Sequence, residues 1–259
     1  MFNLVPCNCV KDIANSFSSR YREPGGDEQI YQTSLMSALI DGVYDGNVTI
    51  EQLLKHGDFG LGTFNGLDGE MVVLDNAAHQ LKSDGTAHLA TMDQKTPFAV
   101  VTFFCPTLMG EIERPHDKAE VQAVIDAMVP ENLLCAFRID GHFAKVETRT
   151  VPRQEPPYVP MLEAIANQPE FTFENTKGTL IGFRCPPYVQ GINVAGFHVH
   201  YITDDRSGGG HVLDYRVLEG SVKVAKVPNL HIALPETPDF ENATLHSDVL
   251  DDAIRKAEG

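Results

Sequence analysis

The chain has no tryptophan, few basic residues and no long apolar run. Its 259 residues include 20 lysines and arginines against 36 aspartates and glutamates, which gives a formal charge of −16. This charge opposes contact with the phosphate backbone of nucleic acids and with an anionic membrane surface. No stretch approaches the roughly 18 consecutive apolar residues of a transmembrane helix. We therefore expect neither a nucleic-acid partner nor a membrane partner, whereas the missing tryptophan excludes nothing.

Cysteine is also scarce. The five cysteines are an odd number, which indicates free thiols in a reducing compartment rather than a disulfide framework. Cys7 and Cys9 could ligate a soft metal, but a pair without a ligand role is the favoured interpretation. The N-terminus lacks a basic region followed by an apolar core, so it does not have the pattern of a secretory signal peptide. A cytoplasmic location is the default expectation.

The expected fold class is α+β, with two domains built on mixed, largely antiparallel β-sheets. The apolar content of 42% is enough for one large core or two modest ones, and the length favours two domains. Residues 1–150 are expected to form an N-terminal mixed-sheet domain with an irregular N-terminal segment. Residues 151–160 contain four prolines and are the candidate linker. Residues 161–259 then form a C-terminal metal-binding β domain that ends in a helix and a tail.

Helical signals are short. Apolar residues recur at helical spacing over residues 35–43, and Thr49 with Gln52 forms a capping-box pattern. A further apolar helix face runs over residues 121–128. Ser247 is expected to cap a last short helix.

Strand signals are more numerous. Residues 98–104 form a continuous apolar run, which is typical of a central strand buried on both faces. Asp140-Gly141 predicts a turn, and Arg149 lies on a polar face of the returning strand. That face is either solvated or lines a polar cleft. A second strand pair is expected to turn at residues 175–178.

Three of the ten histidines lie within fourteen residues, between His198 and His211. His198 and His200 are two residues apart, so on a strand they project to the same face. If the chain turns near Asp205 and Arg206, His211 falls opposite His200, at roughly 4.5–5.5 Å between Cβ atoms. The three imidazoles can then converge on one metal ion held by a β-hairpin.

Three neutral nitrogens on one side of a divalent ion leave its other side open, which is the catalytic pattern. The alternative is that these histidines line a half-buried sheet face, and for a lone histidine it would be preferred. Clustering on one face favours the metal site. Glycines 208–210 are consistent with a bulge or a loose turn. A bound metal together with an arginine can attract an anionic substrate to this acidic chain.

Several linked segments resemble the α-acetolactate decarboxylase family. They occur in the same order along the chain, at residues 31–39, 60–65, 67–70, 196–201 and 208–214. The resemblance implies zinc-dependent decarboxylation of (S)-2-acetolactate, a small oxoacid, to (R)-acetoin and CO₂ in the acetoin/butanediol pathway. The reaction then passes through an enediolate that the metal stabilises, without an organic cofactor. The resemblance also implies a two-domain fold with the larger mixed sheet in the N-terminal domain, and a homodimer.

The resemblance also assigns roles to single residues. The zinc ligands are His198, His200 and His211; the catalytic residues are Glu70, Arg149 and Glu258; and Thr63 lies on the substrate side. Arg149 would hold the departing carboxylate, and a glutamic acid would protonate the enediolate. Which glutamate donates the proton is left open. Cobalt or manganese can share the same ligand set as zinc.

Other functions are compatible with parts of this pattern. The Gly-(x)₆-His-x-His arrangement is close to a cupin motif, which predicts a metal-dependent dioxygenase or isomerase acting on a small oxoacid. Asp204 or Asp205 stands where the glutamate of that motif is expected, which weakens this interpretation. A decarboxylase using a lysine Schiff base is a further alternative. A metal-binding or scaffold protein without turnover is the alternative outside enzymes.

Overall fold

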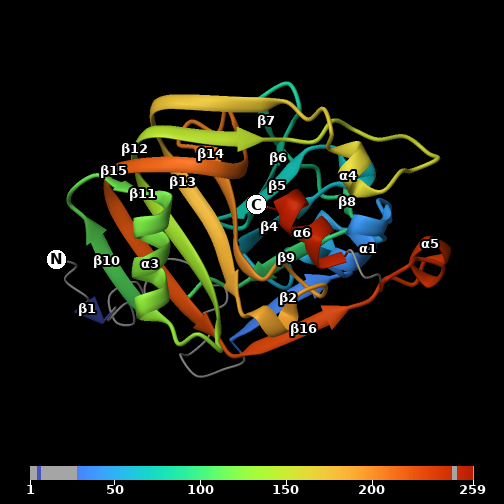
Figure 1. Cartoon of the computed structure of the whole chain (residues 1–259), viewed down its shortest axis with the longest axis horizontal. Helices are drawn as coiled ribbons and strands as arrows, with labels where there is room; N and C mark the ends of the chain where they lie inside the picture. The colour runs from blue at the N-terminus through green and yellow to red at the C-terminus, as the bar shows by residue number, and fades with distance from the viewer. Residues whose placement is uncertain (1–4, 7–27, 247–249, 259) are drawn as a thin grey trace.

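A computed structural model describes residues 5–6, 28–246 and 250–258 of the chain (Figure 1). Nearly all of the predicted irregular N-terminal segment, the Cys7 and Cys9 pair and the Ser247 cap lie outside these residues. Two seven-stranded sheets form the body of the molecule, and short helices flank them.

The first sheet is antiparallel throughout and has the order β1-β10-β15-β12-β13-β14, with β11 also paired to β15. Because β14 also pairs with β15, the strands β12, β13, β14 and β15 form a closed circuit. The strands of this sheet are β1 (Val5–Pro6), β10 (Leu108–Ile112), β11 (His116–Asp117), β12 (Leu134–Arg149), β13 (Glu170–Cys185), β14 (Gly196–Thr203) and β15 (Gly209–Val227).

The second sheet has the order β16-β2-β9-β4-β5-β6-β7. All its pairs are antiparallel except β16 with β2, which is parallel, so the predicted α+β class with largely antiparallel sheets is confirmed. Its strands are β2 (Gln29–Thr33), β4 (Phe59–Thr63), β5 (Glu70–Leu74), β6 (Ala77–Leu81), β7 (Ala87–Leu89), β9 (Ala99–Thr102) and β16 (Asn229–Ala233). A small separate pair joins β3 (Val48–Thr49) to β8 (Lys95–Thr96).

The helices are short. They are α1 (Met36–Asp41), α2 (Ile50–Leu53), α3 (Lys118–Met128), α4 (Met161–Ala164), α5 (Pro238–Glu241) and α6 (Leu250–Glu258), with 3₁₀ turns at Asn65–Leu67 and Pro187–Val189. The predicted capping box is confirmed at the start of α2. The Gln52 backbone N–H donates to the Thr49 hydroxyl, and the Thr49 backbone N–H donates to the Gln52 side-chain oxygen. Among the described residues, no helix combines the length and apolarity needed to span a membrane.

The turns predicted at Asp140-Gly141 and at residues 175–178 are wrong, because β12 and β13 each run on as one strand of 16 residues. Gly141 pairs with Gly178 on one side and with Gly220 on the other. A Cβ atom on Gly141 would lie 2.7 Å from the Glu219 carbonyl oxygen. These glycines therefore allow three backbones to approach closely within the sheet, and they do not reverse the chain.

The two sheets do not follow chain order. Strand β12 precedes residues 151–160, yet it pairs along its length with β13 and β15, which follow them. In the other direction, β16 comes from the C-terminal part and joins β2. The expected boundaries of 1–150 and 161–259 therefore do not separate the sheets, and the assignment of domains to these ranges stays a prediction.

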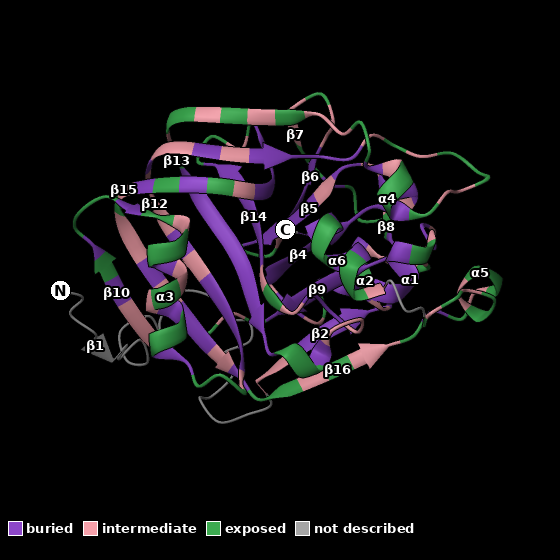
Figure 2. Ribbon diagram, in the orientation of Figure 1, coloured by how far each residue is buried: buried purple, intermediate pink, exposed green. Residues whose placement is uncertain are grey.

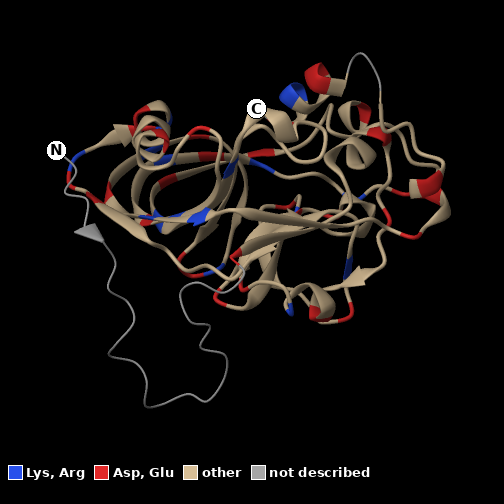
Figure 3. Ribbon diagram, turned by 90° about the horizontal axis from the view of Figure 1, so that it is seen from below, with Lys and Arg blue, Asp and Glu red and all other residues tan. Residues whose placement is uncertain are grey.

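A shared hydrophobic core joins the two sheets, and their strands are buried along the surfaces that meet (Figure 2). It combines Ile30, Leu61 and Val72 of the second sheet with Ala136, Ile181, Phe183 and Ile202 of the first. Helix α6 adds Ile254 and Ala257 and packs against α1 and α4. Acidic residues are spread over the described part of the ribbon (Figure 3). The end of α6 is thus held beside the junction of the sheets, where β14 and β15 contact β5.

Candidate active site

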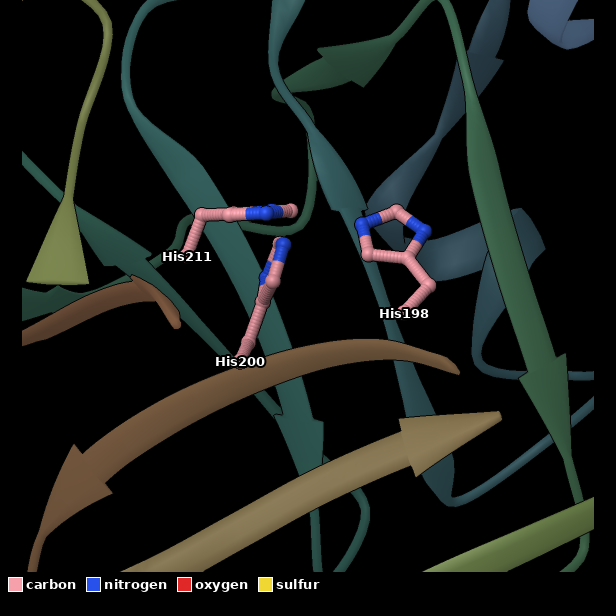
Figure 4. A group of neighbouring side chains, drawn as sticks. All are labelled: His198, His200 and His211. Carbon is pink, nitrogen blue, oxygen red and sulfur yellow. The ribbon is translucent and has the colours of Figure 1, made fainter. Parts of the chain in front are cut away.

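The three histidines of the hairpin converge at the junction of the two sheets (Figure 4). His198 and His200 lie on β14, and His211 on β15 is the direct antiparallel partner of His200. The ring centroids are 5.1, 5.2 and 5.3 Å apart, and one ring nitrogen from each lies within 4.8 Å of the others. The chain turns at Arg206, whose φ is 58°. The predicted hairpin is therefore confirmed.

The surroundings of two of the rings, those of His200 and His211, fix which nitrogen each presents. The His200 Nδ1 lies 2.8 Å from the Met71 carbonyl oxygen of β5. Since a carbonyl only accepts, Nδ1 carries the proton and Nε2 keeps a lone pair. In the same way, the His211 Nε2 lies 3.2 Å from the Glu258 carbonyl oxygen and leaves Nδ1 available. The Nδ1 of His198 has no hydrogen-bond partner among the described residues.

All three histidines are held neutral. Burial, with a further contribution from Arg149, lowers the pKa of His198 to about 3. Burial also holds the pKa values of His200 and His211 well below the usual range. A neutral imidazole is the form that binds a metal. The site therefore requires no proton release from these side chains before an ion binds.

These donors fit a divalent metal ion. Within the described part of the chain, the buried atoms without a partner include the His198 Nδ1, the His200 Nε2 and the Glu258 Oε2. Buried polar atoms without a partner are costly, and native proteins contain few of them. Three imidazole nitrogens are a donor set that zinc accepts in catalytic sites.

Two carboxyl groups face the histidines from different elements. The Glu70 Oε2 at the start of β5 lies 3.6 Å from the His200 Nε2. The Glu258 Oε2 at the end of α6 lies 3.1 Å from the His198 Nε2 and 3.7 Å from the His211 Nδ1. Sequence patterns gave no indication of these contacts, because β5, α6 and the histidine hairpin are far apart along the chain.

Burial changes the protonation of both carboxyl groups. It raises the pKa of Glu70 to about 8, against the opposing charge of Arg149 and with a smaller contribution from Glu258. Burial raises the pKa of Glu258 to about 7, again opposed by Arg149. Burial therefore favours the protonated form, which is the form that a proton donor needs.

Arg149 ends β12 beside the same group. It is paired in register with His211 and is 4% exposed. Its strand face therefore lines a polar cleft at this end and is not solvated there. The Nη1 atom donates to the Gln168 side-chain oxygen over 3.0 Å.

Thr63 ends β4 and is paired in register with Glu70. Its hydroxyl donates to the Gly69 carbonyl oxygen over 2.7 Å. Thr63 therefore holds the backbone that leads into Glu70, in addition to lining the pocket.

Thr63→Val is expected to lower the free energy of unfolding by about 1–3 kcal/mol, because the buried Gly69 carbonyl loses its donor. The valine keeps the volume of threonine, so this change isolates the hydrogen bond. Chemical denaturation of the variant beside Thr63→Ser, which keeps the hydroxyl, measures the difference. Equal stability of the two variants would show that the hydrogen bond has no such role.

One pocket is lined by all seven predicted site residues. The other lining residues are Gly62 and six apolar residues, which are Met36, Leu39, Leu67, Phe98, Val151 and Met161. Sequence reasoning missed these as site residues, because apolar side chains at helical or strand spacing indicate only a core. The one available signal was that Met36, Leu39 and Leu67 lie in segments that resemble the family.

The fold and the site define an α+β enzyme with a buried three-histidine centre between two β-sheets. The sequence model of the α-acetolactate decarboxylase family matches residues 30–247. The α-acetolactate decarboxylase of Raoultella terrigena is 50% identical over 97% of both chains, and that of Klebsiella aerogenes is 48% identical over 100% of this chain and 99% of its own. The chain belongs to the α-acetolactate decarboxylase family.

A solved structure agrees with this assignment. The crystal structure of α-acetolactate decarboxylase from Bacillus subtilis strain 168 superposes with a TM-score of 0.88 at 45% identity. The match covers 89% of this chain and 99% of that one. The similarity therefore extends over most of the chain.

The cupin-like alternative is not favoured. Asp204 and Asp205 are exposed in the turn between β14 and β15. Asp205 accepts hydrogen bonds there from the hydroxyls of Thr203 and Ser207. Neither aspartate lines the histidine pocket, so neither can supply the carboxylate ligand of a cupin motif.

Proposed function

We propose that this protein decarboxylates (S)-2-acetolactate to (R)-acetoin and CO₂ in the acetoin/butanediol pathway. In this proposal, His198, His200 and His211 hold a divalent metal ion, with zinc preferred, and no organic cofactor takes part. The single observation that carries the proposal is that one pocket gathers three buried histidines, a buried arginine and two buried carboxyl groups whose pKa values burial raises. The named activity of the relatives supports the choice of substrate.

The substrate is a β-keto acid whose carboxylate and hydroxyl share one carbon atom. When CO₂ leaves, the electron pair of the broken bond flows into the neighbouring ketone and gives an enediolate. His198, His200 and His211 would hold the divalent ion, which would supply positive charge to stabilise the developing enediolate. Arg149 binds the carboxylate through two parallel hydrogen bonds and orients the breaking bond perpendicular to the carbonyl plane.

A glutamic acid then protonates one face of the enediolate, which fixes the configuration of acetoin. Glu258 is the proposed donor, because its Oε2 is buried, has no hydrogen-bond partner among the described residues and faces the histidines from α6. Glu70 approaches from β5 and is the second candidate. A side chain that is fixed on one element can reach only one face of the planar intermediate. The proton is therefore delivered to that face.

The proposal is tested by incubating the purified protein with racemic acetolactate and measuring CO₂ and acetoin with and without O₂. We expect equal yields in both atmospheres, (R)-acetoin by chiral chromatography, and no covalent adduct after borohydride treatment. A requirement for O₂ would favour a dioxygenase, and a trapped adduct would favour a Schiff base. CO₂ release no faster than in a protein-free control would overturn the proposed activity.

Arg149→Lys is expected to lower kcat/KM by about 10- to 100-fold although the charge is kept, because lysine lacks the planar fork that binds a carboxylate through two hydrogen bonds. Steady-state kinetics measure this effect. Arg216→Lys on the exposed part of β15 is the matched control and should match the parent. Parent-like kinetics of Arg149→Lys would remove Arg149 from the mechanism.

The homodimer and the cytoplasmic location remain predictions. The same holds for the absence of nucleic-acid and membrane partners, which the acidic composition favours. Light scattering after size-exclusion chromatography is expected to give twice the 28.5 kDa mass of the chain. A mass equal to one chain would overturn the expected dimer.

A further inference from the structure

Arg149 is buried, yet its guanidinium has only one partner within the described part of the chain. Among the described residues, no carboxylate oxygen lies within 4.0 Å of it, and its single hydrogen bond runs from Nη1 to the Gln168 Oε1. Its Nε is buried and has no partner. The guanidinium nitrogens without a partner among the described residues are therefore Nε and one terminal nitrogen, Nη2.

Those two free donors form one edge of the guanidinium plane. Nε and Nη2 point in parallel, which is the geometry that binds both oxygens of one carboxylate. Arg149 lines the pocket, and this edge is the part of its guanidinium whose hydrogen-bonding capacity is unused among the described residues. Gln168 contacts the other terminal nitrogen, Nη1.

Gln168 is well placed to hold that side. Its backbone N–H donates to the Ile165 carbonyl oxygen over 3.1 Å, and the Pro169 carbonyl accepts from the Thr150 N–H over 3.2 Å. The loop that carries Gln168 is thereby tied to the residue that follows Arg149. Gln168 does not line the pocket, so it contacts Arg149 from outside the pocket.

We propose that Gln168 is a positioning residue that fixes the Arg149 guanidinium with its Nε and Nη2 edge free for the carboxylate of the substrate. This inference deepens the proposed decarboxylase function and rests on it. Arginine has no acceptor, so the amide of Gln168 must present its oxygen to Nη1. An amide orients the guanidinium without neutralising it, whereas a carboxylate in its place would compete with the substrate for the same charge.

Two substitutions separate these effects. Gln168→Glu keeps the shape and adds a negative charge beside Nη1, so the carboxylate of the substrate should bind more weakly and KM should rise by about 10-fold or more. Gln168→Met keeps the length and removes the hydrogen bond, so kcat/KM should fall by about 10-fold. Gln29→Glu on β2 adds the same charge to a side chain of similar exposure and should match the parent.

Binding of two small molecules provides the test that a merely structural role would not reproduce. The probes are 2-hydroxy-2-methylpropanoate, which carries the carboxylate, and acetoin, which lacks it. Calorimetry on the metal-loaded proteins should show about 10-fold weaker binding of the hydroxy acid to Gln168→Glu and unchanged binding of acetoin. Gln168→Met should also weaken hydroxy-acid binding more than acetoin binding, which covers the case that Gln168→Glu fails to fold.

Equal weakening of both probes, or parent-like binding of both, would overturn the role of Gln168. Failure of the proposed function would give a different result, because the parent protein itself would then release no CO₂ from acetolactate. The probe comparison does not depend on turnover, so the two failures are distinguishable.

Discussion

His200→Ala is expected to remove metal binding and turnover together while both sheets stay folded. His200 is 1% exposed, and the Met71 carbonyl fixes its tautomer so that Nε2 is free to bind an ion. Without it, only His198 and His211 remain as ligands. The loss of several kcal/mol of transition-state stabilisation corresponds to about 10³-fold or more in turnover.

Metal content by mass spectrometry, turnover and circular dichroism measure the three parts of this result. His198→Ala and His211→Ala should behave in the same way. His88→Ala on the exposed end of β7 is the matched control and should keep both metal and turnover. If all three ligand variants kept full metal content and near-normal turnover, the site would have to lie elsewhere.

Glu258→Gln is expected to lower turnover by about 10²–10⁴-fold, which is the usual contribution of a general acid. The amide keeps the shape of the side chain but cannot supply the proton. Its backbone carbonyl still accepts from the His211 Nε2, so the variant should retain its metal. Deleting residues 256–259 removes that carbonyl as well, and metal affinity should then fall by about 10- to 100-fold.

Steady-state turnover, metal content and the enantiomeric purity of acetoin test this prediction. Glu163→Gln, on the exposed side of α4, is the matched control. Unchanged turnover and unchanged enantiomeric purity in Glu258→Gln would assign the proton to Glu70 instead.

The histidine hairpin could be predicted from residues alone because its geometry is local. The two-residue period of a strand places His198 and His200 on one face, and a short turn brings His211 opposite. Glu70, Arg149 and Glu258 could not be found in this way. Three distant elements bring them together, and only the resemblance to a family indicated them.

The turn predicted at Gly141 was wrong because it was inferred from neighbouring residues alone. The Asp140-Gly141 pair has the composition of a turn, yet Gly141 faces Gly178 and Gly220 inside a sheet. Short-range sequence does not distinguish a glycine that reverses the chain from one that lets neighbouring strands approach. Gln168 had no signal at all, because its role depends on a single contact with Arg149 across a loop.

The exchange of strands between the sheets was equally hidden from the sequence. A proline-rich segment at residues 151–160 has the composition of a linker, but β12 before it pairs with β13 after it. The choice of strand partners depends on long-range packing of side chains, and composition does not encode it. Fold class was therefore predictable, whereas the membership of each sheet was not.

The most direct test of the metal centre is a titration of metal-free protein with zinc, in which bound metal and acetolactate turnover are measured in the same samples. Turnover should rise in proportion to bound zinc and reach its maximum at one ion per chain, with no activity in the metal-free sample. Full turnover in protein shown to contain no metal would contradict the proposed metal dependence of the reaction.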